Sequence, residues 1–269
     1  MNTLKALVDA RFTRESTQAP LTGIGSEGVR ASGIHALCPR FEVLRARRRL
    51  PLLRQDTADA RMTFLHGDAI HWAVQNRLLP ELEVLVGRWG CLGCGDSVGG
   101  PASVCMGDFD PAQLVLRPRQ CPCGSREFGY QEMFLQGDGL QGHPDGFLRV
   151  PWREDLGIFE AKSVGYRPQI EEAPLYAHVL QVHVYMHLTG LRWGTILYWH
   201  KAGKGVDALV EHTVDFDPEI VVALREEVRI LREGLDGGAL PARVCGAATD
   251  AFAQRCDLVT PCFEEADGG

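Results

Sequence analysis

The sequence predicts an α/β fold in which a mixed central sheet of about five strands is flanked by helices. Helical and strand-like segments alternate along the chain, which is typical of this class. Short apolar runs between residues 127 and 164 are bounded by turn residues, as expected of neighbouring strands. Cysteines, glycines and prolines interrupt this pattern at residues 87–126, which predicts an inserted module held together by metal.

The N-terminal part predicts a flexible arm followed by two helices. Residues 1–30 are polar and rich in Gly, Ser and Thr, and we expect them to form the arm. Residues 32–49 predict a cap followed by a helix. Apolar residues that include Phe64 and Ile70 predict a second helix over about 60–79.

Strands and helices then follow one another to the C-terminal region. Residues 127–135, 146–150 and 156–164 predict three strands, with a hairpin turn at 151–155 between the last two. A helix over 171–189 and two strands at 194–200 and 208–216 come next. Asp217 and Pro218 are a typical helix start, because Asp caps the first turn and Pro fits within it, so a last helix is predicted over 218–233.

Composition indicates an ordinary soluble protein. The 269 residues are 45% apolar and 23% charged, with a net charge of -7. No apolar run approaches the roughly 18 residues that span a bilayer, and no signal peptide is recognisable, so we expect a cytoplasmic protein without membrane contact. The acidic balance does not exclude nucleic acid, because a local basic surface can bind it. One cluster is either such a surface or only the solvated face of a helix: Arg40, Arg45, Arg47, Arg48, Arg49 and Arg54.

Two acidic residues and a lysine predict a phosphodiester-cleaving site. Asp145 opens the second of the three strands, and Glu160 and Lys162 lie on the third. Side chains alternate along a strand, so Glu160 and Lys162 share one face while Ala161 points to the other. A hairpin would bring Asp145 beside Glu160. Carboxylates hold Mg²⁺ or Mn²⁺, and a metal-polarised water held by Lys162 could attack a phosphate.

Two further motifs extend this pattern. His71 follows Gly67 by four residues on the second predicted helix, where the glycine would permit close backbone packing. A single helical histidine is more often structural than catalytic. Gln181 and Tyr185 are four residues apart on the 171–189 helix and therefore share a face. Such a pair, taken alone, usually serves packing.

In this order the four motifs resemble the RecB-like branch of the PD-(D/E)XK nuclease superfamily, which has G-x-x-x-H, G-x-x-D, E-x-K and Q-x-x-x-Y. The resemblance implies a restriction-endonuclease-like core formed by residues 31–86 and 127–269. It implies that His71, Asp145 and Glu160 are metal ligands, with the Ala161 carbonyl as a further ligand. Lys162 would position the nucleophile, and Gln181 and Tyr185 would contact the DNA backbone.

Four cysteines surround this core in the sequence and predict a second metal group. Four thiolates are what a 4Fe–4S cluster requires, although a zinc ion would also fit them. One cysteine upstream and three downstream resemble the iron–sulphur nucleases of the AddB type and the CRISPR-associated Cas-four type, and the cluster would close the chain like a clasp. The first downstream interval, C-x10-C, departs from the usual C-x2-C, so Cys245 is the least secure ligand. The four are Cys38, Cys245, Cys256 and Cys262.

The inserted segment predicts a zinc-ribbon-like module. Two closely spaced cysteine pairs resemble the knuckles of a zinc ribbon, although the second is C-x-C rather than C-x2-C. Cys105 is a fifth thiol that could replace one of the four. The module could grip DNA or act only as a structural staple. The predicted Zn²⁺ ligands are Cys91, Cys94, Cys121 and Cys123.

The expected function is a Mg²⁺- or Mn²⁺-dependent deoxyribonuclease, an exonuclease acting on single-stranded DNA ends. The alternative is a non-catalytic DNA-binding or assembly subunit that retains the nuclease fold, and an RNase or structure-specific endonuclease also stays open. No phosphate-binding loop of the G-x-x-x-x-G-K-[ST] kind is present, so any helicase would be a partner. Partners in repair, recombination, phage or CRISPR machinery are equally compatible with the sequence, and the oligomeric state is undetermined.

Overall fold

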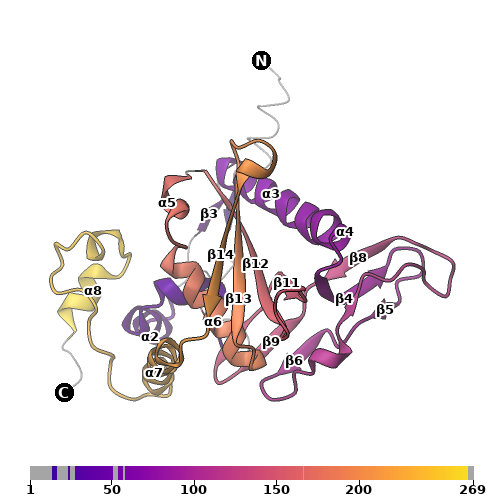
Figure 1. Cartoon of the computed structure of the whole chain (residues 1–269). Helices are drawn as coiled ribbons and strands as arrows, with labels where there is room; N and C mark the ends of the chain where they lie inside the picture. Colours follow the sequence, from indigo (N-terminus) through magenta and orange to yellow (C-terminus); the bar gives the residue numbers. More distant parts are fainter. Residues whose placement is uncertain are drawn as a thin grey trace.

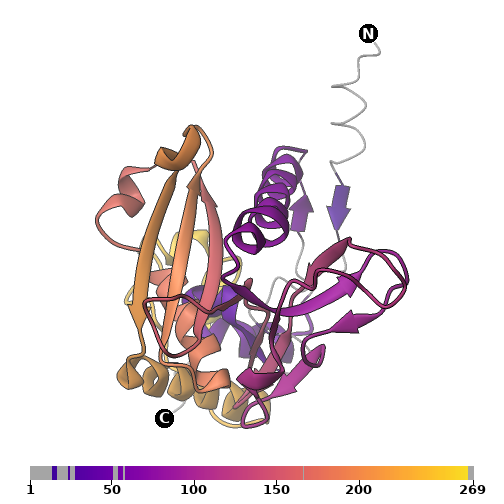
Figure 2. The ribbon, with the colours of Figure 1, turned by 45° about the vertical axis from the view of Figure 1, so that its right-hand side comes forward.

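A mixed sheet with helices on both faces organises the chain (Figures 1 and 2). The computed structural model describes residues 14–16, 24, 28–50, 54–56, 58–165 and 167–265. Most of the predicted flexible arm at 1–30 lies outside these residues. Within it, strand β1 (Arg14–Ser16) pairs antiparallel with β3 (Arg54–Asp56). The mixed α/β class is therefore confirmed, and the arrangement is consistent with a restriction-endonuclease-like core.

The main sheet has eight strands in the described part of the chain, more than the five that were predicted. Its order is β14-β13-β12-β11-β4-β5, and β7 and β8 also pair with β4. Strands β12 and β13 are parallel, whereas the other pairs are antiparallel. The strands are β4 (Leu85–Cys91), β5 (Ser97–Val98), β7 (Val115–Leu116), β8 (Phe128–Gln131), β11 (Gly146–Leu148), β12 (Gly157–Val164), β13 (Trp193–His200) and β14 (Leu209–Asp215).

A smaller four-stranded sheet lies beside the main one. Its order is β2-β10-β9-β6. The predicted strand at 127–135 is in fact divided between the two sheets, because β8 ends at Gln131 and β9 begins at Phe134. The strands of this sheet are β2 (Val29–Arg30), β6 (Ser103–Cys105), β9 (Phe134–Gly137) and β10 (Leu140–Gly142).

Helices cover the two faces of the main sheet and enclose separate apolar cores. On one face Ile158 and Ile196 pack with residues of helices α2, α6 and α7; on the other, Phe159 and Trp193 pack with residues of α3 and β4. The alternation along β12 that the sequence predicts is therefore confirmed. The helices are α2 (Pro39–Arg47), α3 (Ala58–Ala73), α4 (Leu79–Glu81), α5 (Pro168–Glu171), α6 (Tyr176–Thr189), α7 (Pro218–Leu235) and α8 (Val259–Glu264).

Short helical segments adjust the ends of the longer helices and the connections between strands. Those with 3₁₀ geometry are η1 (Ala31–Ala36), η3 (Pro111–Gln113), η4 (Gly205–Ala208) and η5 (Ala253–Arg255). The segment η2 (Val74–Leu78), which continues α3, is π-helical. The predicted helix at 32–49 is divided into η1 and α2, because Pro39 takes the first position of α2 and Cys38 is its extended N-cap.

Strand β4 is the element that the sequence pattern hid. The predicted start of the insert at residue 87 falls inside this strand, which pairs with β11 on one side and β8 on the other. A Cβ at Gly87 would lie 2.4 Å from the Tyr130 hydroxyl, and one at Gly90 would lie 2.4 Å from the Gln131 amide nitrogen. The two glycines therefore make room for side chains of β8, and their presence disguised the strand as a loop.

The described helices include none that combines the length and the apolar character needed to cross a membrane.

Candidate active site and cysteine clusters

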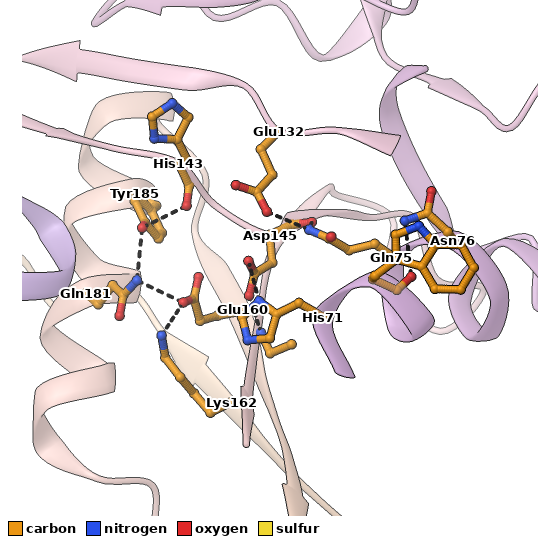
Figure 3. A network of polar contacts seen from close by, with 12 residues as sticks. His71, Gln75, Asn76, Glu132, His143, Asp145, Glu160, Lys162, Gln181 and Tyr185 are labelled. Carbon is orange, nitrogen blue, oxygen red and sulfur yellow. Dashed lines mark hydrogen bonds and ion pairs between the residues drawn. The ribbon is translucent and has the colours of Figure 1, made fainter. Parts of the chain in front are cut away.

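The predicted catalytic residues meet at the edge of the main sheet where β11 begins (Figure 3). Asp145 directly precedes β11, and Glu160 lies on the neighbouring strand β12. His71 comes from α3 on one face of the sheet, and Gln181 from α6 on the other. Separate elements thus contribute to one polar centre, as the order of the motifs predicts.

Asp145 is held by a backbone donor and by the histidine. Its Oδ2 accepts a hydrogen bond from the Ala161 backbone N–H at 2.7 Å, and its Oδ1 lies 3.2 Å from His71 Nδ1. The hydrogen bond with Asp145 raises the pKa of His71, against the opposing effect of burial. The β11–β12 hairpin therefore brings Asp145 to Glu160's strand, and α3 brings His71 to the same carboxylate.

Glu160 is a buried carboxylate with one occupied and one open oxygen. Its Oε1 accepts hydrogen bonds from Lys162 Nζ at 2.5 Å and from Gln181 Nε2 at 2.8 Å. Its Oε2 is buried and has no hydrogen-bond partner among the described residues. Burial and the charge of Asp145 raise the pKa of Glu160 to about 8. Burial would lower the pKa of Lys162, but Glu160 and Asp145 raise it above its usual value, so the lysine is a cation.

Gln181 and Tyr185 form the inner wall of this centre. Gln181 Nε2 also donates to the Tyr185 hydroxyl at 3.0 Å, and that hydroxyl donates to the His143 carbonyl at 2.9 Å. Both side chains are buried. Their contacts position Glu160 and the loop before Asp145, whereas direct contact with the DNA backbone stays a prediction.

Two glycines of the predicted motifs differ in what they do. A Cβ at Gly142 would lie 2.7 Å from Tyr185 Cε1, so a larger residue would displace the tyrosine. A Cβ at Gly67 would lie 3.6 Å from Ser163 Oγ, which is ordinary van der Waals contact. The prediction that Gly67 is needed for close backbone packing is therefore wrong for this structure.

Two polar residues of the centre, Gln75 and Glu132, belong to no sequence motif. Glu132 lies between β8 and β9, and its Oε1 accepts a hydrogen bond from Gln75 Nε2 at 2.9 Å. The same amide donates to the Asp145 carbonyl at 2.9 Å. Burial and the charge of Asp145 raise the pKa of Glu132. The sequence carried one signal that could have found this residue, namely a charged side chain inside an otherwise apolar strand pattern.

The centre has the donors that a hard divalent ion prefers. Carboxylate oxygens and an imidazole suit Mg²⁺ or Mn²⁺, and the buried, unpartnered Oε2 of Glu160 marks a place where a cation would be stabilised. The ligand atoms of His71, Asp145 and Glu160 do not all lie within 4.8 Å of one another; among the described residues only one His/Cys/Asp/Glu group does. Binding an ion would therefore draw these side chains closer together.

That tight group consists of the four cysteines predicted for the insert. The Sγ atoms of Cys91 and Cys123 lie 3.6 Å apart, as do those of Cys94 and Cys121. Tetrahedral zinc with Zn–S bonds of about 2.3 Å places its sulphurs about 3.8 Å apart, so the spacing fits a single ion. Cys105 lies outside the group, with its Sγ 3.5 Å from Gln136 Nε2. The four cysteines form a site that could bind metal, and the fifth does not belong to it.

The second set of cysteines lines a larger cavity beside α2, at the opposite end of the molecule from β5 in Figure 1. The cavity has a volume of about 520 Å³. Its four cysteines do not form a group as tight as that of the insert, within the described part of the chain. Burial, with a smaller contribution from the other three thiols, raises the pKa of Cys38. A cluster with several irons separates its thiolates more than one ion does, so the wider spacing suits the predicted 4Fe–4S group. The cavity-lining thiols are Cys38, Cys245, Cys256 and Cys262.

The basic cluster of α2 serves the fold rather than a free surface. Arg40 is fully buried, and its guanidinium donates to the carbonyls of Pro241 at 2.8 Å, Cys262 at 2.9 Å and Glu265 at 2.7 Å. Arg48 pairs with the Glu265 carboxylate at 2.5 Å. Arg45 pairs with Glu42 at 3.2 Å, and Arg47 donates to the Gly234 carbonyl at 3.1 Å. Arg54 has no described side chain. The proposed DNA-binding role of these arginines is replaced by one of fastening the C-terminal segment.

Arg40→Met is expected to release this segment. The methionine side chain could fill part of the space but could not satisfy the three carbonyls, so we expect a loss of about 3 kcal/mol or more in the free energy of unfolding. Chemical denaturation and limited proteolysis of residues 241–265 measure it. The control is Arg49→Met, an exposed position just after the same helix, which should change stability by less than about 0.5 kcal/mol. Equal stability of the two variants would contradict the fastening role.

Comparisons with known proteins add only weak similarities. No protein-family model matches the chain, and no curated protein matches its sequence. The alkaline exonuclease LHK-Exo from Laribacter hongkongensis is 13% identical, with a TM-score of 0.44 over 78% of this chain and 88% of that one. Its complex with dAMP gives 14%, 0.42, 78% and 88%. A phage-related exonuclease from Haemophilus somnus 129PT is 11% identical, with a TM-score of 0.36 over 78% of this chain and 94% of that one.

Proposed function

We propose that this protein is a Mg²⁺- or Mn²⁺-dependent nuclease that hydrolyses phosphodiester bonds of DNA. The carrying observation is the convergence of His71, Asp145 and Glu160, with Lys162 bonded to Glu160, at one edge of the sheet. This set also carries the sequence resemblance to the RecB-like PD-(D/E)XK nucleases. Four motifs far apart in the sequence would have no structural reason to meet with this donor set unless they served one site.

The three predicted ligands differ in how firmly they are placed. Asp145 is fixed by the Ala161 N–H and Glu160 by Gln181, so both carboxylates are oriented before any ion arrives. His71 keeps about a quarter of its side chain exposed, at 28%, which leaves a path from solvent. When bound there, Mg²⁺ or Mn²⁺ would stabilise the growing negative charge on the phosphate and lower the pKa of a water. The Ala161 carbonyl is a further proposed ligand.

Lys162 is the residue that would act on the nucleophile. It stays a cation beside Glu160. Its ammonium group has three donors, of which one is used by Glu160, so another can hold the attacking water. Gln181 and Tyr185 keep Glu160 in place during the reaction through their own hydrogen bonds. The protein thus supplies oriented ligands and a fixed positive charge for an in-line attack.

The two cysteine sites complete the proposal. We assign Zn²⁺ to Cys91, Cys94, Cys121 and Cys123, whose sulphur spacing supports a single ion. A 4Fe–4S cluster is assigned to the cavity lined by Cys38, Cys245, Cys256 and Cys262, which would join the chain before the core to the chain after it, as in nucleases of the AddB and Cas-four type. Both assignments are structural, because neither site lies among the residues of Figure 3.

Degradation of labelled DNA with Mn²⁺ tests the activity. Wild-type protein should degrade linear single-stranded DNA and spare a circular strand of the same sequence, as expected of an exonuclease that needs an end. Lys162→Met keeps the apolar stem but loses the ammonium group, so the rate should fall by about 10²–10⁴-fold. The control Lys204→Met, on an exposed turn, should cut like the wild type.

Other outcomes distinguish the alternatives. Cutting of the circular strand would indicate an endonuclease, and degradation of RNA alone would indicate an RNase. Binding of DNA without any cutting by the wild type, under the full range of Mg²⁺ and Mn²⁺ concentrations, would overturn the enzyme in favour of a binding or assembly subunit. The ultraviolet–visible spectrum of anaerobically purified protein tests the cluster, which absorbs broadly near about 400 nm when iron and sulphide are bound.

A further inference from the structure

Glu132 is a carboxylate beside the proposed metal centre that none of the four motifs contains. It lies within hydrogen-bonding reach of the Asp145 carboxyl group, and the charges of Asp145 and His71 both act on it. Figure 3 shows its carboxyl group directed toward Asp145, on the other side of that residue from Lys162. The centre therefore contains three carboxylates rather than the two that the sequence motifs supply.

The position of Glu132 is fixed by the π-helical segment that follows His71. Gln75, in η2, is buried and bonds both Glu132 Oε1 and the Asp145 carbonyl, each at 2.9 Å. The neighbouring Asn76 accepts a hydrogen bond from the Tyr130 N–H at 2.8 Å, which ties the segment to β8 just before Glu132. Short π-helical segments often occur at functional sites. Here the segment orients two acidic residues with one amide and leaves Glu132 Oε2 for a further contact.

Asp145 is the member that the two glutamates share. Its charge acts strongly on Glu132 and on Glu160, whereas neither glutamate is a principal electrostatic partner of the other. Figure 3 agrees, since Glu132 and Glu160 approach Asp145 from different sides. An aspartate flanked in this way can bridge two cations, and paired divalent ions about 3.5–4 Å apart are common in phosphodiester-cleaving enzymes.

The charge of the centre also calls for more than one cation. Three acidic side chains face one permanent cation, Lys162, and Glu160 Oε2 is buried without a partner among the described residues. One divalent ion would neutralise the protein groups but would leave the phosphates of an incoming strand uncompensated. We propose that Glu132 and Asp145 bind a second divalent ion, next to the one assigned to His71, Asp145 and Glu160. This inference rests on the proposed nuclease function and adds a ligand to its site.

Mn²⁺ binding to the full-length protein tests the second ion without any cleavage. Titration of MnCl₂, followed by isothermal calorimetry and by electron paramagnetic resonance, should give two bound ions per chain with a spin-coupled signal in the wild type. Glu132→Gln retains Oε1 as an acceptor for Gln75 but removes the charge. It should bind one uncoupled ion, with the second affinity lowered by at least about 10-fold and cleavage by about 10–100-fold. Glu154→Gln, exposed in the β11–β12 hairpin, is the matched control and should behave like the wild type.

The outcomes separate this inference from the function on which it rests. Wild-type protein that cuts DNA yet binds one Mn²⁺, or a Glu132→Gln variant with unchanged stoichiometry and affinity, would overturn the second ion and leave the nuclease standing. Wild-type protein that neither cuts DNA nor binds Mn²⁺ would overturn both. Thermal unfolding of Glu132→Gln checks the fold, and a variant that melts well below the wild type would assign Glu132 a structural role and overturn the inference.

Discussion

Asp145→Asn is expected to abolish cleavage while the fold persists. The substitution removes the charge shared by the proposed metal ligands, so kcat/KM should fall by about 10³-fold or more, which corresponds to about 4 kcal/mol of transition-state stabilisation. The amide is nearly isosteric with the carboxylate. Its oxygen can accept from the Ala161 N–H, and its nitrogen can donate to His71 Nδ1, so both present contacts have replacements. Steady-state degradation of labelled DNA and Mn²⁺ affinity measure the change.

Asp138→Asn is the matched control for this experiment. Asp138 bonds His187 at 3.0 Å and Arg225 at 3.1 Å, outside the centre drawn in Figure 3, and its positive φ of 50° is one that asparagine tolerates. The control should cut like the wild type. If Asp145→Asn retained wild-type cleavage, the proposed centre would be wrong. If it lost cleavage together with cooperative unfolding, Asp145 would be structural.

The core of the candidate site could be predicted because it depends on local geometry. The period of two along a strand sets the faces of Glu160 and Lys162, and a short hairpin sets the approach of β11 to β12. Gln181 and Tyr185 share a face because they are one helical turn apart. These rules need no knowledge of the rest of the chain, and the structure follows them.

The remaining parts depend on contacts between distant segments. Gln75 reaches Glu132 only because α3 continues into a π-helical turn, and nothing in the apolar pattern of 60–79 signals that turn. Arg40 looks like part of a basic surface until the C-terminal carbonyls that surround it are known. Strand β4 was hidden because Gly87 and Gly90 are chosen for the side chains of β8 rather than for strand propensity.

The acidic net charge and the fastened arginines together limit how DNA could be bound. With Arg40, Arg45, Arg47 and Arg48 engaged inside the protein, α2 offers little free positive charge. Attraction of DNA would then depend on the metal centre itself, where Lys162 and divalent ions face the phosphates. Under this proposal binding without metal should be weak, which gives the ions a role in affinity as well as in chemistry.

Cys121→Ser is expected to remove zinc from the insert and to loosen the edge of the main sheet. A hydroxyl is a far poorer zinc ligand than a thiolate, so zinc affinity should fall by about 10³-fold or more and zinc content should drop from about one ion per chain toward zero. Cys91 and Cys121 are buried in the same apolar core as Trp89 and Phe128. Without the ion, residues 92–126 lose the bonds that close them, and β4 and β8 lose packing at their outer ends. Elemental analysis and limited proteolysis measure the two effects.

Cys105→Ser is the control, and it also decides which thiols form the site. Cys105 is exposed and outside the four-cysteine group, so its replacement should leave zinc content and protease resistance unchanged. Loss of zinc from Cys105→Ser, with retention in Cys121→Ser, would show that the ligand set is wrong. Because Glu132 follows β8 directly, loosening of that strand should reach the metal centre, and Cys121→Ser should therefore also weaken Mn²⁺ binding there. A purely peripheral staple would lose zinc and leave the Mn²⁺ affinity of the centre as it is in the wild type.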